Sequence, residues 1–267
     1  MLHRPAPVAA VSRKIMRVRF GVPVLMYHLV SDDVPAAFRD YTVTPRQFAG
    51  HVRTLRQFDY HSISPDDLLA ARERRRPLPP RPVVITFDDG FRDCLRHAAP
   101  LLHDAGLGAT MYVVAGLLGK TSRWMEPEGV DLPLVSVAEA RELEQAGIAC
   151  QSHALTHPSL ARLGTPRIAR ELSESRRVLE DELGHEIRHL AYPHGSFDDR
   201  VRAEAEQAGY LSACTTQPGK VLPSDDALAL PRVKIEGREG PADFLTRLVT
   251  GRHLGHPVRR QPSSRRR

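Results

Sequence analysis

Short apolar runs alternate with helical patterns along most of this chain. The runs at 22–30, 83–87, 109–114, 148–152, 188–192 and 210–215 are typical of strands. Strands that alternate with helices through short connections form right-handed parallel units. The sequence therefore predicts an α/β fold in a single domain, either an open doubly wound sheet or a closed barrel. In both architectures active sites gather at the carboxyl ends of the strands.

The intervening helices carry start and stop signals. Thr44 followed by Pro45 predicts a helix start, and Ser136 with Glu139 forms a capping box. We also expect helices over 92–105, 165–183 and 198–208. Gly106, Gly147 and Gly184 are placed to end helices.

Charge is concentrated at the carboxyl terminus. The formal net charge is +6, and six arginines without any acid lie within 252–267, so residues 1–251 are formally neutral. We expect a basic disordered tail over 252–267 that makes at most a weak contact with an anionic surface. We expect no specific nucleic-acid partner. Residues 1–20 form an N-terminal extension, and 21–251 the domain.

The cysteines and the N-terminus bear on the compartment. Cys94, Cys150 and Cys214 are far apart and odd in number, which argues against a disulfide framework or a thiolate zinc site. No signal peptide and no stretch long enough to span a bilayer is evident. We therefore expect a cytoplasmic protein.

Two adjacent carboxylates, Asp88 and Asp89, follow the apolar run "VVITF" directly and precede Gly90. Carboxylates in contact raise each other's pKa unless a positive group intervenes. A polar turn is the simpler interpretation of "DDG" alone. The rest of the sequence favours a functional role for the two aspartates.

Two histidines, His153 and His157, follow the strand "IACQS" four residues apart. Together with one aspartate they make a three-ligand site with an open position, the arrangement of catalytic zinc. The second aspartate is then free to take a proton from an attacking water. The metalloprotease helix motif is excluded because Ala154 replaces its glutamate and Pro158 stops a helix.

A third strand end carries the turn "YPHG" at 192–195. A turn of this kind can present backbone N–H groups to a developing oxyanion. Three polar strand ends in succession indicate one shared site.

The motifs "TFDDG" (86–90), "SHALTHP" (152–158) and "AYPHG" (191–195) resemble those of the polysaccharide deacetylases, the NodB homology group of carbohydrate esterase family four. The resemblance covers roughly residues 20–235. It implies a distorted (β/α) barrel and metal-dependent N-deacetylation of an amino sugar or polysaccharide. By position, Asp89, His153 and His157 would bind the ion and Asp88 would be the base. Zinc suits these ligands, although cobalt or nickel would fit.

The chain departs from the family pattern at the third motif and later. Ala191 stands where an arginine often orients the base, and His194 stands where an aromatic residue is usual. The late histidine that acts as general acid is not visible in 228–237. His194 or His28 is the remaining candidate for that role. We expect Asp88 and His194 to be catalytic, and the substrate to contact Tyr192, Pro193, Trp124 and His28.

Two alternatives remain open. The missing arginine and late histidine are compatible with a catalytically impaired member that binds a glycan. A phosphohydrolase of the haloacid dehalogenase type also places aspartates after a strand, but it requires Asp-x-Asp and gives His153 and His157 no role.

Overall fold

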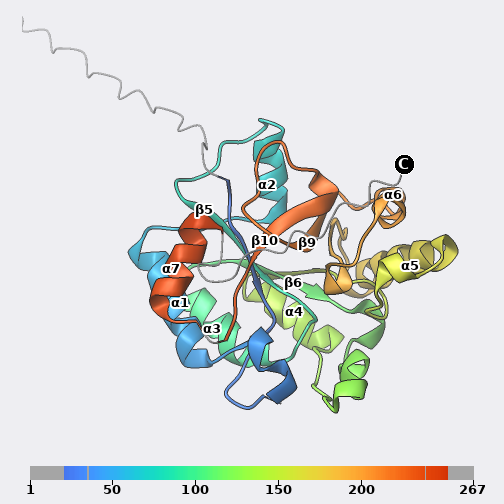
Figure 1. Cartoon of the computed structure of the whole chain (residues 1–267), viewed down its shortest axis with the longest axis horizontal. Coiled ribbons are helices and arrows are strands. Elements are labelled where there is room, and N and C mark those ends of the chain that lie inside the picture. Colours follow the sequence, from blue (N-terminus) through green and yellow to red (C-terminus); the bar gives the residue numbers. More distant parts are fainter. Residues whose placement is uncertain (1–20, 35, 238, 252–267) are drawn as a thin grey trace, which may run out of the picture.

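A computed structural model describes residues 21–34, 36–237 and 239–251. The strands lie at the centre and the helices surround them (Figure 1). The strands are β1 Val24–Tyr27, β2 Leu29–Val30, β3 Thr42–Val43, β4 His61–Ser62, β5 Pro82–Phe87, β6 Ala109–Val113, β7 Ile148–Ser152, β8 His189–Ala191, β9 Ser212–Pro218 and β10 Leu230–Lys234. The α-helices are α1 Pro45–Gln57, α2 Pro65–Arg72, α3 Ala99–Asp104, α4 Val137–Gln145, α5 Thr165–Leu183, α6 Asp199–Gln207 and α7 Pro241–Thr250.

Short helices of other types fill several connections. Residues Cys94–Ala98 (η2) form a π-helical turn that leads into α3. The 3₁₀ turns are η1 Ala36–Tyr41, η3 Ala115–Leu117, η4 Arg123–Glu128, η5 Leu160–Arg162, η6 Pro193–Gly195 and η7 Ala227–Ala229.

Seven parallel strands close into a barrel within the described part of the chain. Their order is β1-β10-β9-β8-β7-β6-β5, and β5 pairs back onto β1 with Leu25 opposite Ile85. β4 pairs with the first two residues of β5, while β2 and β3 form a separate pair. The barrel is distorted where β9 advances four residues, from Cys214 to Pro218, while β10 advances two. The predicted distorted (β/α) barrel in a single domain is confirmed.

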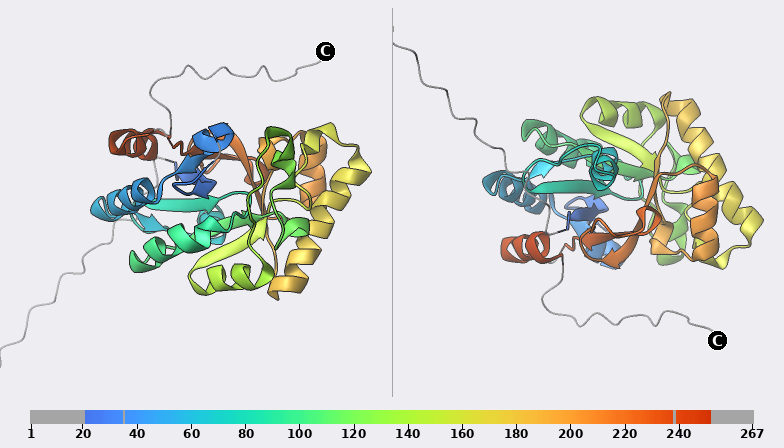
Figure 2. Two further views of the ribbon diagram at one scale, coloured as in Figure 1. Left: turned by 90° about the horizontal axis from the view of Figure 1, so that it is seen from below. Right: turned by 90° about the horizontal axis from the view of Figure 1, so that it is seen from above.

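The barrel interior is apolar at its amino end. Val24, Val84, Tyr112 and Leu230 pack there, and Leu68 of α2 joins the same cluster. The larger core lies between the strands and the surrounding helices, which the side views show as an outer layer (Figure 2). Because the amino end is filled, polar side chains at the carboxyl ends of the strands are the ones placed to act on a ligand.

Local sequence signals account for most helix starts. Ser136 makes the predicted capping box with Glu139, and Thr44, predicted as a cap, makes a reciprocal one with Gln47. Helix α2 and the strands β3, β4 and β10 were not anticipated. β10 contains Pro231, and proline argues against a strand inside a sheet because it has no N–H to donate.

The N-terminal extension and the basic tail predicted at 1–20 and 252–267 lie outside the described residues. Among the described helices, none combines the length and apolar character needed to cross a membrane.

Asp93 ties the segment after the DDG turn to β2. Its Oδ2 accepts a hydrogen bond from the Val30 N–H, two residues after His28, and its Oδ1 is buried without a partner among the described residues. Burial raises the pKa of Asp93 from 3.8 to about 7, although backbone N–H groups oppose the shift. This carboxyl therefore changes charge near neutral pH.

We predict that Asp93→Asn alters the pH dependence of stability. Between about pH 4 and 7 the native wild type keeps a proton that its unfolded chain has released, so its free energy of unfolding falls as pH rises. The Asp93→Asn variant has no carboxyl to titrate and lacks this loss. Its free energy of unfolding minus that of the wild type should therefore rise with pH, at most by about 1.4 kcal/mol per pH unit. Denaturant unfolding at pH 5, 6 and 7 measures it.

The exposed Asp104 at the end of α3 offers a matched control. The difference in free energy of unfolding between Asp104→Asn and the wild type should stay constant across the same pH range. A flat difference for Asp93→Asn as well would contradict the assigned titration.

Candidate functional site

The DDG turn directs its two carboxylates into different surroundings. β5 ends at Phe87, and the Asp88 N–H then donates to the Tyr27 carbonyl of β1 at 2.9 Å. Asp89 and Gly90 both have left-handed backbones, with φ of 73° and 78°. A Cβ on Gly90 would lie 3.3 Å from the backbone of Val113, so glycine suits this turn in both respects. Both aspartates are less than 5% exposed, at 3% and 4%.

Asp88 is held by a buried arginine that the sequence analysis did not identify. Nη1 and Nη2 of Arg232 donate to the two carboxylate oxygens at 2.7 and 2.6 Å. The same guanidinium donates to the Thr86 hydroxyl at 3.2 Å and to the Thr215 carbonyl at 2.9 Å. Burial alone would raise the pKa of Asp88, but the Arg232 charge outweighs it and holds that pKa below its ordinary value. Asp88 is therefore an oriented anion.

Asp89 faces the two histidines instead. Its Oδ1 lies 3.2 Å from Nε2 of His153 and 3.1 Å from Nε2 of His157. Burial would raise the pKa of Asp89, whereas hydrogen bonds from both imidazoles keep it well below the ordinary value. The two neighbouring carboxylates thus have separate partners.

Each histidine presents Nε2 to the same point. Nδ1 of His153 lies 2.7 Å from the Ala191 carbonyl, which requires a proton on Nδ1, so Nε2 is the ring nitrogen that faces Asp89 and would ligate an ion. Burial lowers the pKa of His157 to about 4, so this ring is neutral at neutral pH. Neutral imidazoles are the form that ligates metals.

These three side chains fit a divalent metal ion. One ligand atom from each of Asp89, His153 and His157 lies within 4.8 Å of the others, and all three residues are buried. Two imidazole nitrogens and one carboxylate oxygen match a catalytic site with an open position. An ion bound there would replace the close contacts that Nε2 of each histidine makes with Oδ1 of Asp89.

The third strand end reaches this cluster through His194. This exposed residue has φ of 57°, and its ring meets His157 edge-on at 4.5 Å. Tyr192 and Pro193 are both buried. The Tyr192 hydroxyl donates to the Leu228 carbonyl at 2.9 Å and its ring stacks on Phe197, so the expected contact of this ring with substrate has no support in the geometry.

His28 and Trp124 both lie beside the cluster. Trp124, in the 3₁₀ turn η4, stacks on the His157 ring at 4.2 Å. His28 interrupts β1 and β2, and its Nδ1 is buried without a partner among the described residues. Burial lowers the pKa of His28, and the charges of Asp88 and Asp89 oppose this shift, which places the ring near both carboxylates.

A row of aromatic rings continues from this point, and the sequence analysis missed it. Phe91 lies 6.3 Å from Trp124 and 5.5 Å from Phe38, and Phe38 stacks on Tyr41 at 5.1 Å. Lys234 of β10 covers the Tyr41 ring at 4.4 Å. Phe91 follows the DDG motif directly, and that position was the available signal. The row forms one wall beside the site.

Comparisons with known proteins agree with this geometry. The family model described as "Polysaccharide deacetylase" matches residues 75–213, just over half of the chain. The protein YxkH of Bacillus subtilis, itself named only provisionally as a polysaccharide deacetylase, is 26% identical over 222 residues, which cover 83% of this chain and 74% of that protein. A poly-beta-1,6-N-acetyl-D-glucosamine N-deacetylase of Staphylococcus aureus is 23% identical over 206 residues, covering 74% of this chain and 69% of the relative.

Solved structures have the same fold. A polysaccharide deacetylase from Bacillus cereus superposes with a TM-score of 0.72 at 25% identity, over 85% of this chain and 69% of that one. The deacetylase PplD of Streptococcus pyogenes gives a TM-score of 0.75 at 24% identity, over 85% and 97% of the two chains. With the family model matched over its motif-bearing strands, this chain belongs to the polysaccharide deacetylase family.

Proposed function

We propose that this protein is a metal-dependent hydrolase that removes N-acetyl groups from amino sugar units of a polysaccharide. The observation that carries the proposal is the division between the adjacent aspartates. Arg232 donates two hydrogen bonds to Asp88. Asp89 instead faces His153 and His157. Such a division supports one carboxylate as a proton acceptor and the other as a ligand.

Asp89, His153 and His157 would hold the ion, and zinc is the metal that best suits two imidazoles and a carboxylate, with cobalt and nickel as alternatives. A divalent ion bound there would supply Lewis-acid chemistry to the acetyl carbonyl and to water. Asp88 has the oriented lone pairs of a general base. It accepts the proton of the water that adds to the acetyl carbon.

Collapse of the resulting tetrahedral species breaks the C–N bond, and the leaving nitrogen needs a proton. We assign this proton to His28, because its Nδ1 has no described partner and its ring lies near Asp88 and Asp89. His194 is the alternative, but it is exposed and packs against the ligand His157. Acetate and the free amine are the products, and solvent exchange restores both proton carriers.

The substrate class rests on the family and on the aromatic wall. The Staphylococcus aureus relative is named for deacetylation of poly-beta-1,6-N-acetyl-D-glucosamine, and we propose an N-acetylated glycan of this general kind here. The half-buried Trp124 is the ring of this wall nearest to the metal cluster and is the proposed sugar contact. The contribution of backbone N–H groups in the turn 192–195 to an oxyanion site stays a prediction.

The proposed function predicts acetate release from N-acetylglucosamine oligomers by protein loaded with zinc. Removal of the ion with a chelator should abolish release, and added zinc should restore it, because Asp89, His153 and His157 would contribute to the reaction only through the ion that they hold. A panel of free, oligomeric and polymeric N-acetylated sugars would identify the preferred length. Release that is unaffected by chelation would contradict metal dependence.

His28→Gln should lower turnover by a factor on the order of 10²–10⁴, the usual contribution of a general acid. Zinc affinity should not change, because His28 lies outside the ligand set. His194→Gln is the matched control and should retain most of the activity. The reverse ranking of the two variants would assign the acid to His194.

A further inference from the structure

A buried glutamate lies under the loop that joins the two histidine ligands. Glu171, on α5, is 4% exposed. Its Oε2 accepts hydrogen bonds from the backbone N–H groups of Leu155 and Thr156 at 3.1 and 2.9 Å. Its Oε1 accepts one from the Thr156 hydroxyl at 2.6 Å. One carboxylate therefore satisfies three donors between His153 and His157.

The loop needs such support because its backbone is unfavourable. Ala154 and His157 have φ of 61° and 63°, in the left-handed region that residues with a Cβ seldom occupy. Conformations of this kind are strained and persist only when the surrounding structure holds them in place. Pro158 follows directly and cannot continue a helix.

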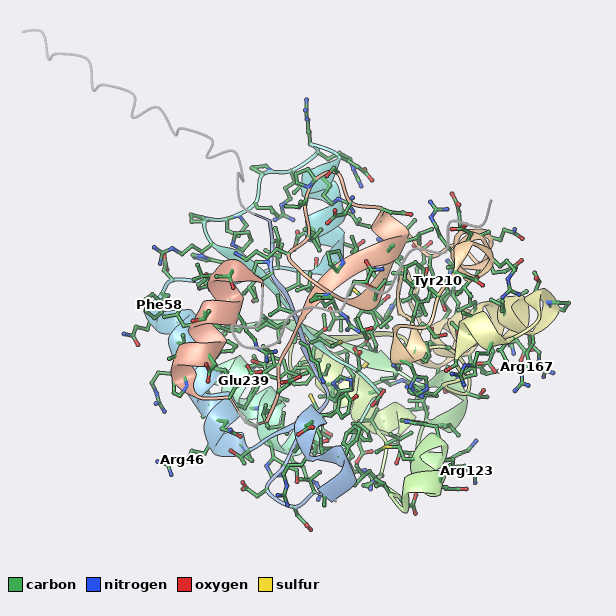
Figure 3. The ribbon with its side chains drawn as sticks, viewed as in Figure 1. Arg46, Phe58, Arg123, Arg167, Tyr210 and Glu239 are labelled. Atoms are coloured by element: carbon green, nitrogen blue, oxygen red, sulfur yellow. The ribbon has the colours of Figure 1, made fainter. Side chains whose placement is uncertain are left out.

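Helix α5 also supports the start of the loop, one turn further along the same face. Ser175 lies four residues after Glu171, and its hydroxyl is 3.0 Å from that of Ser152. The Ser152 hydroxyl in turn accepts from the Ala154 N–H at 3.2 Å. Tyr210, which Figure 3 labels beside α5 and α6, lies 3.0 Å from the Ser175 hydroxyl. The helix thus fixes the loop at two points.

Glu171 differs from the acidic residues of the outer face of α5. Hydrogen bonds from the loop satisfy it, and it has no ion pair within the described residues, whereas the neighbouring Glu174 pairs with Arg170 at 3.0 Å near the surface. Hydrogen bonds that end on a charged acceptor are roughly twice as strong as neutral ones. The buried Glu171 carboxylate therefore serves to hold the loop.

We propose that Glu171 is a positioning residue that sets the separation and orientation of His153 and His157, and thereby the affinity of the site for a divalent ion. It acts through the loop backbone and does not contact the ion. This inference rests on the metal site of the proposed function. Loss of an outer-shell partner of a metal ligand typically costs 10–100-fold in metal affinity.

The test uses three variants of the whole chain, Glu171→Gln, Glu171→Leu and Glu174→Gln. The dissociation constant for zinc alone is measured by calorimetry, and the unfolding temperature is measured on metal-free protein. We expect Glu171→Leu to weaken zinc binding by ~10–100-fold. Glu171→Gln should lose less, because its carbonyl still accepts from the backbone and the Thr156 hydroxyl can turn to accept from its amide. Glu174→Gln should bind as the wild type does.

Zinc affinity unchanged in both Glu171 variants, with only a lower metal-free unfolding temperature, would overturn the inference and leave Glu171 a purely structural residue. If Glu171→Leu does not fold, the comparison of Glu171→Gln with Glu174→Gln still decides. Failure of the wild type to bind zinc would instead overturn the proposed function, so the two failures are distinguishable.

Discussion

The buried pair between Arg232 and Asp88 is the interaction on which the rest of the site depends. It joins the residue after β5 to the middle of β10 through two hydrogen bonds of 2.6–2.7 Å. Without such a partner, burial and repulsion from Asp89 would both raise the pKa of Asp88 and favour its protonated form. Because Arg232 balances the negative charge of Asp88, Asp89 can pair with the histidines instead. Two adjacent residues with the same side chain can then do different chemistry.

This pair also changes the significance of the departures from the family motifs. Ala191 at the third motif removes the arginine expected there, which favoured a glycan-binding member with impaired catalysis. Arg232 reaches Asp88, the proposed base, from β10 instead and makes a bidentate contact with it. The contact that an arginine makes in the folded protein therefore indicates its role better than its position in the sequence does. The same reasoning applies to the missing late histidine, since His28, between β1 and β2, lies near both aspartates.

Much of the architecture and part of the site could be predicted from the sequence, because those features depend on local signals. The capping residues Thr44 and Ser136 begin helices as expected. The DDG and HxxxH motifs end parallel strands, so their meeting at one edge followed from the fold class. β10 could not be found in this way, because Pro231 argues against a strand and only the pairing with β1 and β9 makes one.

Contacts between distant elements account for the other omissions. Nothing local indicates that Arg232 reaches Asp88, 144 residues away. Glu171 offered a weak signal, as an acidic residue beside Leu172 on the buried face of α5. Tyr192 was expected to contact the substrate, but it is buried and its ring stacks on Phe197. In each case the partner that decides the role comes from another element.

The central claim is that Asp88 and Asp89 divide the roles of base and ligand, and one paired measurement tests it most directly. Zinc content and acetate release are determined on the same preparations of Asp88→Asn and Asp89→Asn. We expect Asp88→Asn to keep its zinc while turnover falls by a factor on the order of 10²–10⁴, and Asp89→Asn to lose zinc and activity together. Zinc lost from Asp88→Asn and retained in Asp89→Asn would contradict the account, as would full activity in both.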